Sequence, residues 1–276
     1  MKSIRILCFV TLLAQLPRTV YAQQYRMPQD NWYFSGLSVA GNFGAIAIGP
    51  DDNIYVATNN SAVAVFKTDG TFLRQFGSDM NIAGIALDSQ TNVYLLDLAA
   101  STNLVKKFNT TGGFLMSFAA RGTNETEILP SGEYSRIAVG KNDQVYVADN
   151  GNYRVQVFTT NGSHLFHWGE SSGGNSGFAS RFSELNSIAL MPNGNIVARN
   201  SYQTPGRTAS YRSYELQMFS PEGQFLTLKT PTAVVFNNNL LSRSIATSPD
   251  GLVWSWPRLH SQEWAKSADI PGLNGY

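Results

Sequence analysis

An internal repeat of five units is the sequence feature that most constrains how this chain can fold. An Ile-Ala pair opens each unit, and a turn rich in Pro, Asp, Asn and Gly follows it. The pairs are Ile46-Ala47, Ile85-Ala86, Ile137-Ala138, Ile188-Ala189 and Ile245-Ala246. A second apolar run begins seven or eight residues after each Ile, at Ile54, Val93, Val145, Ile196 and Leu252. A constant period of this kind indicates a repeat architecture rather than a single irregular core.

Two further runs complete each of the first four units. A phenylalanine marks the third run, and a leucine follows it seven residues later, across a turn such as TDG or TNG. The pairs are Phe66 and Leu73, Phe108 and Leu115, Phe158 and Leu165, and Phe219 and Leu226. The pattern predicts a four-stranded antiparallel meander of about 40 to 55 residues, which is the length of a propeller blade.

The third unit reads VYVADNGNYRVQVFTTNG followed by LFHWG, and it resembles an NHL repeat. The first unit, NIYVATNNSAVAVFKTDGTFLRQFG, is similar, and the resemblance extends over about residues 44–256. It implies a β-propeller, commonly of six blades. We therefore predict an all-β fold, a β-propeller of four-stranded antiparallel blades, with five blades as the first choice and six or a truncated six as the alternative.

The last unit lacks a fourth apolar run, whereas Trp32-Tyr33-Phe34 forms a lone strand-like run ahead of the first unit. The N-terminal strand is therefore predicted to complete the last blade, which would close the ring and remove an exposed sheet edge.

The N-terminus has the pattern of a secretory signal peptide. Lys2 and Arg5 precede the apolar run 6–14, and Val20-Tyr21-Ala22 ends the segment with a small residue. The apolar run is too short to cross a hydrocarbon core, which needs about 20 residues. We predict a signal peptide over residues 1–22, a single propeller domain over 23–276, and a secreted, extracellular protein without a membrane span.

Composition limits the classes of partner. Without residues 1–22 the formal net charge falls from +1 to −2, and only 14% of residues are charged. This gives no global attraction to nucleic acid. The one cysteine, Cys8, lies in the signal segment, so no disulfide or cysteine-bound metal is expected. The sequons at Asn59, Asn109, Asn124 and Asn161 fall in predicted turns or loops, as glycosylation acceptors would if the host permits.

A binding surface is predicted where the longer loops gather. In a meander, the loops after the second and fourth strands share one face, and these loops are longer and more varied than the others. In the fourth unit, 23 residues separate Ile196 from Phe219, against 12 to 15 in the other units, so residues 199–214 are predicted to be an inserted loop. Tyr and Arg dominate binding hot spots. The candidate ligand-binding residues are Tyr153, Arg154, Arg199, Tyr202, Arg207, Tyr211, Arg212 and Tyr214. For Arg154, an ion pair with Asp149 that ties the loop together is the competing interpretation.

No catalytic constellation is recognisable in the sequence. His164 and His167 lie three apart on a predicted strand, so they are expected to point to opposite faces and not to share a metal. The inner ends of the first strands carry no acidic ring for calcium. We therefore expect a binding or scaffold module for an extracellular protein or glycan, monomeric, with no cofactor, no metal and no catalytic residues. The alternative is a propeller enzyme resembling peptidyl-hydroxyglycine amidating lyase or a calcium-dependent lactonase.

Overall fold

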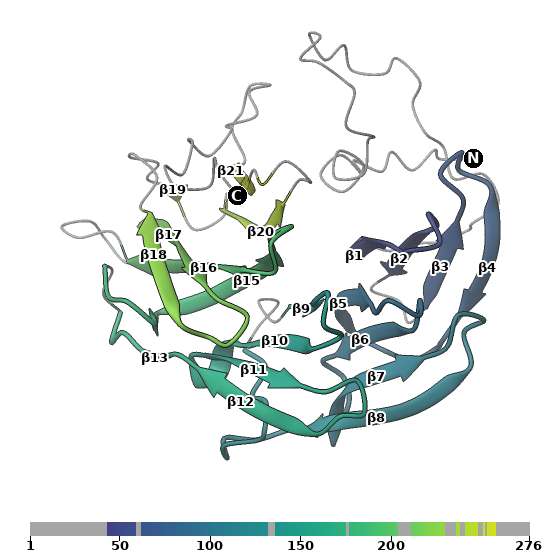
Figure 1. Cartoon of the computed structure of the whole chain (residues 1–276), viewed down its shortest axis with the longest axis horizontal. Helices are drawn as coiled ribbons and strands as arrows, with labels where there is room; N and C mark the ends of the chain where they lie inside the picture. Colours follow the sequence, from purple (N-terminus) through teal and green to yellow (C-terminus); the bar gives the residue numbers. More distant parts are fainter. Residues whose placement is uncertain are drawn as a thin grey trace, which may run out of the picture.

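The computed structural model describes residues 43–58, 62–131, 136–174, 177–203, 211–229, 236–237, 241–247, 251 and 253–257. These residues form antiparallel sheets, and no α-helix occurs among them. Figure 1 shows the sheets following one another around an arc, with the first strand of each sheet toward the middle and the fourth strand outside.

Four sheets have the predicted meander, and a two-stranded sheet follows them. Sheet 1 contains β1 (Phe43–Ile48), β2 (Ile54–Thr58), β3 (Val63–Phe66) and β4 (Phe72–Phe76). Sheet 2 contains β5 (Ile82–Leu87), β6 (Val93–Asp97), β7 (Asn103–Phe108) and β8 (Phe114–Ala120). Sheet 3 contains β9 (Ile137–Val139), β10 (Val145–Asp149), β11 (Arg154–Phe158) and β12 (His164–Trp168). Sheet 4 contains β15 (Glu184–Leu190), β16 (Ile196–Gln203), β17 (Tyr211–Phe219) and β18 (Phe225–Lys229).

The remaining elements are short. The fifth unit contributes β20 (Leu241–Thr247) and β21 (Val253–Pro257), and β19 (Phe236–Asn237) pairs with β17. Strands β13 (Glu170–Ser171) and β14 (Arg181–Phe182) form a parallel pair between sheets 3 and 4, and a 3-10 turn, η2 (Asn150–Asn152), joins β10 to β11. The all-β propeller prediction is confirmed. Trp32-Tyr33-Phe34, and with them the predicted closure of the ring, lie outside the described residues, and the number of blades stays a prediction.

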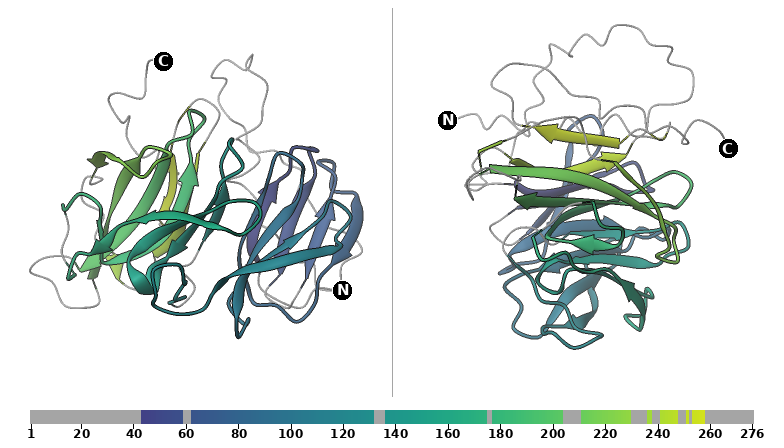
Figure 2. Two further views of the ribbon diagram at one scale, coloured as in Figure 1. Left: turned by 60° about the horizontal axis from the view of Figure 1, so that its bottom comes forward. Right: turned by 90° about the vertical axis from the view of Figure 1, so that its left-hand side faces the viewer.

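The core lies between neighbouring sheets. Four buried clusters combine side chains of two consecutive sheets, such as Tyr55 and Leu95 from sheets 1 and 2, or Tyr146 and Phe219 from sheets 3 and 4. The first strands contact one another in sequence, β1 with β5, β5 with β9, β9 with β15 and β15 with β20. Figure 2 shows the sheets stacked side by side. Because sheets 2 and 3 are covered on both faces in this way, their second strands, β6 and β10, are buried at every residue rather than at alternate residues.

An aromatic side chain of each sheet covers a glycine of the next sheet. Phe76, Phe118 and Trp168 lie at or near the ends of the fourth strands of sheets 1 to 3, and each lies against the turn between the third and fourth strands of the following sheet. A Cβ atom added to Gly112, Gly162 or Gly223 in those turns would lie 2.5 to 2.7 Å from that aromatic side chain. These glycines also have φ values of +91°, +79° and +83°. Both the backbone conformation and the close contact therefore require glycine.

A β-bulge recurs near the start of the fourth strand in each of sheets 1 to 4. In sheet 3, Val157 pairs with Phe166 but Phe158 pairs with His164, so Leu165 is an extra residue on β12. The same shift occurs in the other three sheets, where the extra residues are Leu73, Leu115 and Leu226. The four repeated leucines are thus the bulged residues, and their exposed fractions of 36 to 49% place them in solvent rather than in the core.

Candidate functional site

The connections after the second and fourth strands define what we call the long-loop face. Its largest described parts are residues 121–129, between β8 and β9, and residues 172–174 and 177–183, between β12 and β15, which we call the loop 172–183. The turn 150–153, between β10 and β11, lies on the same face.

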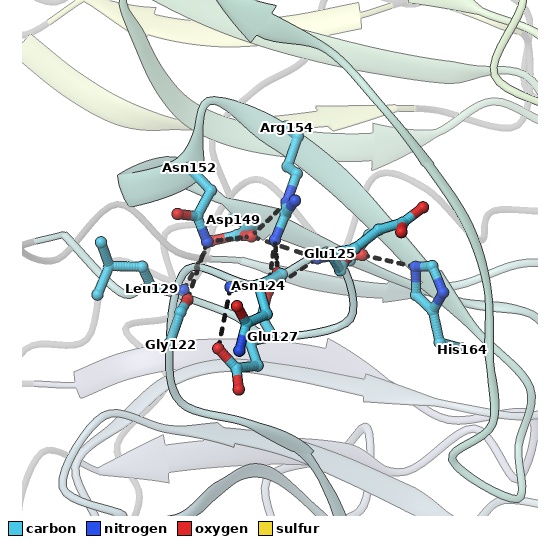
Figure 3. Close-up of polar contacts among 10 residues, drawn as sticks. Gly122, Asn124, Glu125, Glu127, Leu129, Asp149, Asn152, Arg154 and His164 are labelled. Carbon is cyan, nitrogen blue, oxygen red and sulfur yellow. Dashed lines mark hydrogen bonds and ion pairs between the residues drawn. The ribbon is translucent and has the colours of Figure 1, made fainter.

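The loop 121–129 is fastened to sheet 3 by polar side chains (Figure 3). Arg154 Nη2 donates hydrogen bonds to the carbonyls of Asn124, at 2.5 Å, and Glu127, at 2.8 Å. Gln156 Nε2 donates to the carbonyls of Glu125 and Glu127, at 2.9 and 2.8 Å. The backbone N–H of Leu129 donates to Asp149 Oδ1 at 2.8 Å. Sheet 3 therefore satisfies the backbone polar groups of a loop that comes from sheet 2.

Asp149 and Arg154 form a buried ion pair at the centre of this contact. Arg154 Nε lies 2.9 Å from Asp149 Oδ2, and the Asp149 side chain is completely buried. Burial raises the pKa of Asp149, while the hydrogen bonds from Asn152, Leu129 and Arg154 act in the opposite direction. The ion pair spans β10 and β11 at one register position. Arg154 therefore ties the loop together, as the competing interpretation of the sequence held.

The loop 172–183 is fastened to sheet 4 in the same manner. Gln217 Nε2 donates to the carbonyl of Arg181 at 2.9 Å, and its Oε1 accepts the N–H of Ser180 at 2.9 Å. Glu215 is completely buried and accepts the N–H of Gly177 at 2.9 Å. Asn200 Oδ1 accepts the N–H of Ser183 at 2.8 Å.

The anchoring residues recur at one position of the repeat. The fifth residue of the second strand accepts a backbone N–H from the incoming loop at 2.8 Å in three sheets: Asp97 from Asn81, Asp149 from Leu129, and Asn200 from Ser183. A polar residue two positions before the third-strand phenylalanine, Gln156 or Gln217, holds the loop carbonyls. Their fixed position in each unit is the sequence signal that could have identified them.

The exposed large side chains of this face lie beside the anchored loops. Tyr153 is 37% exposed and has a φ of +57°, which is uncommon for a bulky residue. Phe178 is 46% exposed, and the guanidinium of Arg181 lies 5.8 Å from its ring centroid. Arg181 Nε also lies 2.9 Å from Glu170 Oε1. A Cβ on Gly169 would lie 2.8 Å from the Tyr153 carbonyl, and Glu170 is its chain neighbour, so the backbone segments that carry these residues are neighbours on the long-loop face. We refer to Tyr153, Phe178 and Arg181 as the patch.

The described parts of the predicted insertion, residues 199–203 and 211–214, do not form the loop that the sequence predicted. Strands β16 and β17 continue their pairing as far as Gln203 and Arg212, so most of the insertion lengthens a hairpin. Arg199, Tyr202 and Tyr214 are at most 7% exposed. The Arg199 guanidinium lies 4.4 Å from the Tyr214 ring centroid, so these two residues pack against each other. Backbone pairing places Tyr211 and Arg212 on β17, and Arg207 lies outside the described residues.

The reasoning that separated His164 from His167 was wrong. Because Leu165 is a bulge, His164 pairs with Phe158 and His167 pairs with Gln156, which lie on the same face of β11. The two ring centroids are 6.0 Å apart. Across the described ranges, no group of three or more His, Cys, Asp or Glu residues is arranged to hold a metal ion.

The sequons at Asn109, Asn124 and Asn161 lie outside strands, and Asn59 lies outside the described residues. Asn124 and Asn161 are exposed. Asn109 Oδ1 accepts hydrogen bonds from Thr111 and Gly113 within its own turn. In the part of the chain that the structure describes, no helix has the length and apolar character needed to cross a membrane.

The sequence model of the NHL repeat matches residues 135–158, which contain β9 to β11. No curated protein sequence matches the chain. A protein of unknown function from Bacteroides thetaiotaomicron VPI-5482 is similar in structure, with a TM-score of 0.58, 18% identity, and coverage of 79% of this chain and 58% of that one. The WD40 β-propeller domain of Doa1 has a TM-score of 0.55, 14% identity, and coverage of 84% and 65%. The chain thus spans less than two thirds of the length of either structure. A protein of unknown function from Bacteroides caccae has a TM-score of 0.50 and 13% identity over 79% and 72% of the two chains.

Proposed function

This chain is a β-propeller that contains an NHL repeat, and we propose that it is a secreted module that binds an extracellular protein or glycan through its long-loop face. The observation that carries the proposal is the patch of Tyr153, Phe178 and Arg181, where exposed side chains sit on loops whose backbone is fixed by hydrogen bonds. A fixed backbone reduces the ordering that binding must impose, which improves affinity.

The residues of the patch suit recognition of a partly polar ligand. Tyr and Arg offer large contact areas together with polar groups, and they are enriched at binding hot spots. Tyr153 keeps a left-handed backbone that places its ring in solvent, and such conformations persist at functional sites. Arg207, Tyr211 and Arg212 belong to the same proposal, and Tyr211 and Arg212 are the first residues of β17. The burial of Arg154, Arg199, Tyr202 and Tyr214 favours a structural role for those four residues.

The test replaces Tyr153, Phe178 and Arg181 together by Ala in the full chain. Binding would be screened on arrays of glycans and of purified extracellular proteins, and the affinity for the strongest ligand would be measured by biolayer interferometry. We expect the triple variant to bind at least about tenfold more weakly, as loss of hot-spot residues implies. A control variant, Phe114→Ala with Leu115→Ala, removes exposed apolar surface from β8 and should bind like the parent.

Unchanged affinity in the triple variant, or an equal loss in the control, would exclude this patch. Secretion is tested separately by expressing the full chain in cultured eukaryotic cells. We expect the protein in the medium with Gln23 as its first residue, and a mass that falls after enzymatic removal of N-glycans. Retention of the whole protein inside the cells would contradict the proposed localisation.

A further inference from the structure

The bulge at Leu165 brings two imidazole rings to one face of sheet 3, away from the patch described above. His164 and His167 are both partly buried, and their ring centroids are 6.0 Å apart. Two imidazoles that share one tetrahedral ion with nitrogen bonds of 2.0–2.1 Å have centroids roughly 5 Å apart. A small rotation of two partly exposed side chains covers the difference.

Hydrogen bonding fixes which nitrogen of His164 can accept a metal. The Gln156 amide nitrogen donates to two carbonyls, so its oxygen, Oε1, is the atom that faces His164 Nε2 at 2.8 Å. An oxygen can only accept, so a neutral His164 carries its proton on Nε2 and keeps a lone pair on Nδ1. A histidine that binds a metal through one ring nitrogen typically donates a hydrogen bond from the other, as His164 does to Gln156.

His167 also has a ring nitrogen that the described protein does not use. Its Nδ1 is buried and has no hydrogen-bond partner. Buried polar atoms of this kind call for a ligand, an ion or a water molecule.

The surroundings of the His164 ring combine burial with a nearby carboxylate. Burial, together with the neighbouring His167, lowers the pKa of His164, and Arg154 acts in the same direction while Glu125 opposes it. A depressed pKa keeps the ring free of a competing proton near neutrality. In Figure 3 the Glu125 side chain extends toward His164, which places a carboxylate charge near the pair that attracts a cation.

We propose that His164 and His167 form a binding site for one divalent transition-metal ion of the kind that imidazole prefers, such as Cu²⁺, Ni²⁺ or Zn²⁺. The two rings supply the protein ligands, and water completes the coordination. The site lies on the outer strand of the sheet, so the ion would be exchangeable.

The experiment titrates Cu²⁺ into the purified full chain, prepared without a polyhistidine tag, and follows binding by calorimetry and by electron paramagnetic resonance. We expect one ion per chain, with nitrogen couplings from two imidazoles. His164→Ala and His167→Ala should each weaken binding by at least about tenfold, in line with loss of one of two protein ligands. His260→Ala removes the remaining histidine of the chain and should bind like the parent.

Circular dichroism of each variant checks that the fold is retained. If His164→Ala alters the fold, His164→Gln, which can still donate to Gln156 Oε1, takes its place with the same expected loss of binding. The proposal is overturned if the parent binds no Cu²⁺ at millimolar concentration, if the spectrum shows no nitrogen couplings, or if only His260→Ala weakens binding.

Discussion

Replacing Gly162 by Ala tests whether the contact between an aromatic side chain of one sheet and a turn of the next sheet stabilises the fold. In this case Phe118 of sheet 2 packs against the turn of sheet 3 that contains Gly162. Gly162 has a φ of +79°, and the left-handed region costs an L-residue about 1–2 kcal/mol. The new methyl group would also lie 2.7 Å from the Phe118 Cβ and Cγ atoms. Overpacking of this kind costs about 1–3 kcal/mol. The free energy of unfolding should therefore fall by roughly 2–5 kcal/mol.

Gly174 provides the matched control. Its φ is +89°, but no atom lies within 4 Å of an added Cβ. Gly174→Ala should therefore lose stability only through the strained backbone conformation. The assay is urea unfolding followed by tryptophan fluorescence, together with thermal melting. A loss of 1 kcal/mol lowers the Tm of a domain of this size by about 2–4 °C, so Gly162→Ala should melt roughly 5–15 °C below the parent. Gly174→Ala should lose only the backbone part, about 1–2 kcal/mol.

The double variant Phe118→Ala, Gly162→Ala separates the contact from the backbone conformation. With the ring absent, the Phe118 Cγ and Cδ1 contacts disappear and only the Cβ contact at 2.7 Å remains, so the cost of Gly162→Ala in the Phe118→Ala background should shrink by a part of the about 1–3 kcal/mol that overpacking costs. Equal losses for Gly162→Ala and Gly174→Ala, or strict additivity in the double variant, would refute the argument that the Phe118 ring occupies the space above the turn.

Three further predictions concern single residues. Tyr153→Gly should raise the free energy of unfolding by up to about 1 kcal/mol, because glycine adopts the φ of +57° without strain, and should weaken ligand binding; a lower Tm would show that the Tyr153 ring stabilises the fold. Glu215→Gln should cost roughly 1–3 kcal/mol, because an amide nitrogen in place of Oε2 would leave the Gly177 N–H unpaired. Amide hydrogen exchange should then accelerate over residues 177–183, and unchanged exchange there would contradict the anchoring role. The pKa of His164 is lowered in the folded protein, so the unfolded chain binds the proton more tightly than the folded chain does. The neutral ring therefore contributes its full stabilisation above the usual pKa of 6.5. This stabilisation is lost as the pH falls through the lower pKa of the folded protein. His164→Gln should flatten the decline of Tm below pH 6.5, and a decline as steep as the parent's would rule out His164 as its source.

The repeat predicted most of the fold because each strand begins at a constant distance from its Ile-Ala pair. The runs at Ile54, Val93, Val145 and Ile196 all start second strands at the expected residue. The bulges could not be predicted, because Leu165 and its counterparts have the composition of ordinary strand residues. One extra residue reverses the side to which the following side chains point, and this reversal made the interpretation of His164 and His167 wrong.

The candidate site was predicted less well because burial of polar residues cannot be seen in a sequence. Arg199 and Tyr214 have the composition of a binding loop, yet they pack together inside a long hairpin. Phe178 and Arg181 lie in a segment rich in Gly and Ser, where no pattern separates an outward residue from an anchoring one. Tyr153 was identified because it stands beside Arg154 in the loop after the second strand of the third unit, on the face that was predicted to bind, and because Tyr is enriched at binding hot spots.

The way in which the long loops are held has a consequence for how such a protein can diversify. Arg154, Gln156 and Gln217 form hydrogen bonds with backbone carbonyl and N–H groups of the loops. These bonds do not depend on which side chains the loops expose to solvent. Point substitutions at Glu125, Phe178 or Arg181 therefore change the side chain that a partner would meet. They do not remove the hydrogen bonds that Gln156 and Gln217 make to the backbone of these residues. Natural selection or a combinatorial library could exchange these outward residues freely on an unchanged frame, as antibodies exchange theirs.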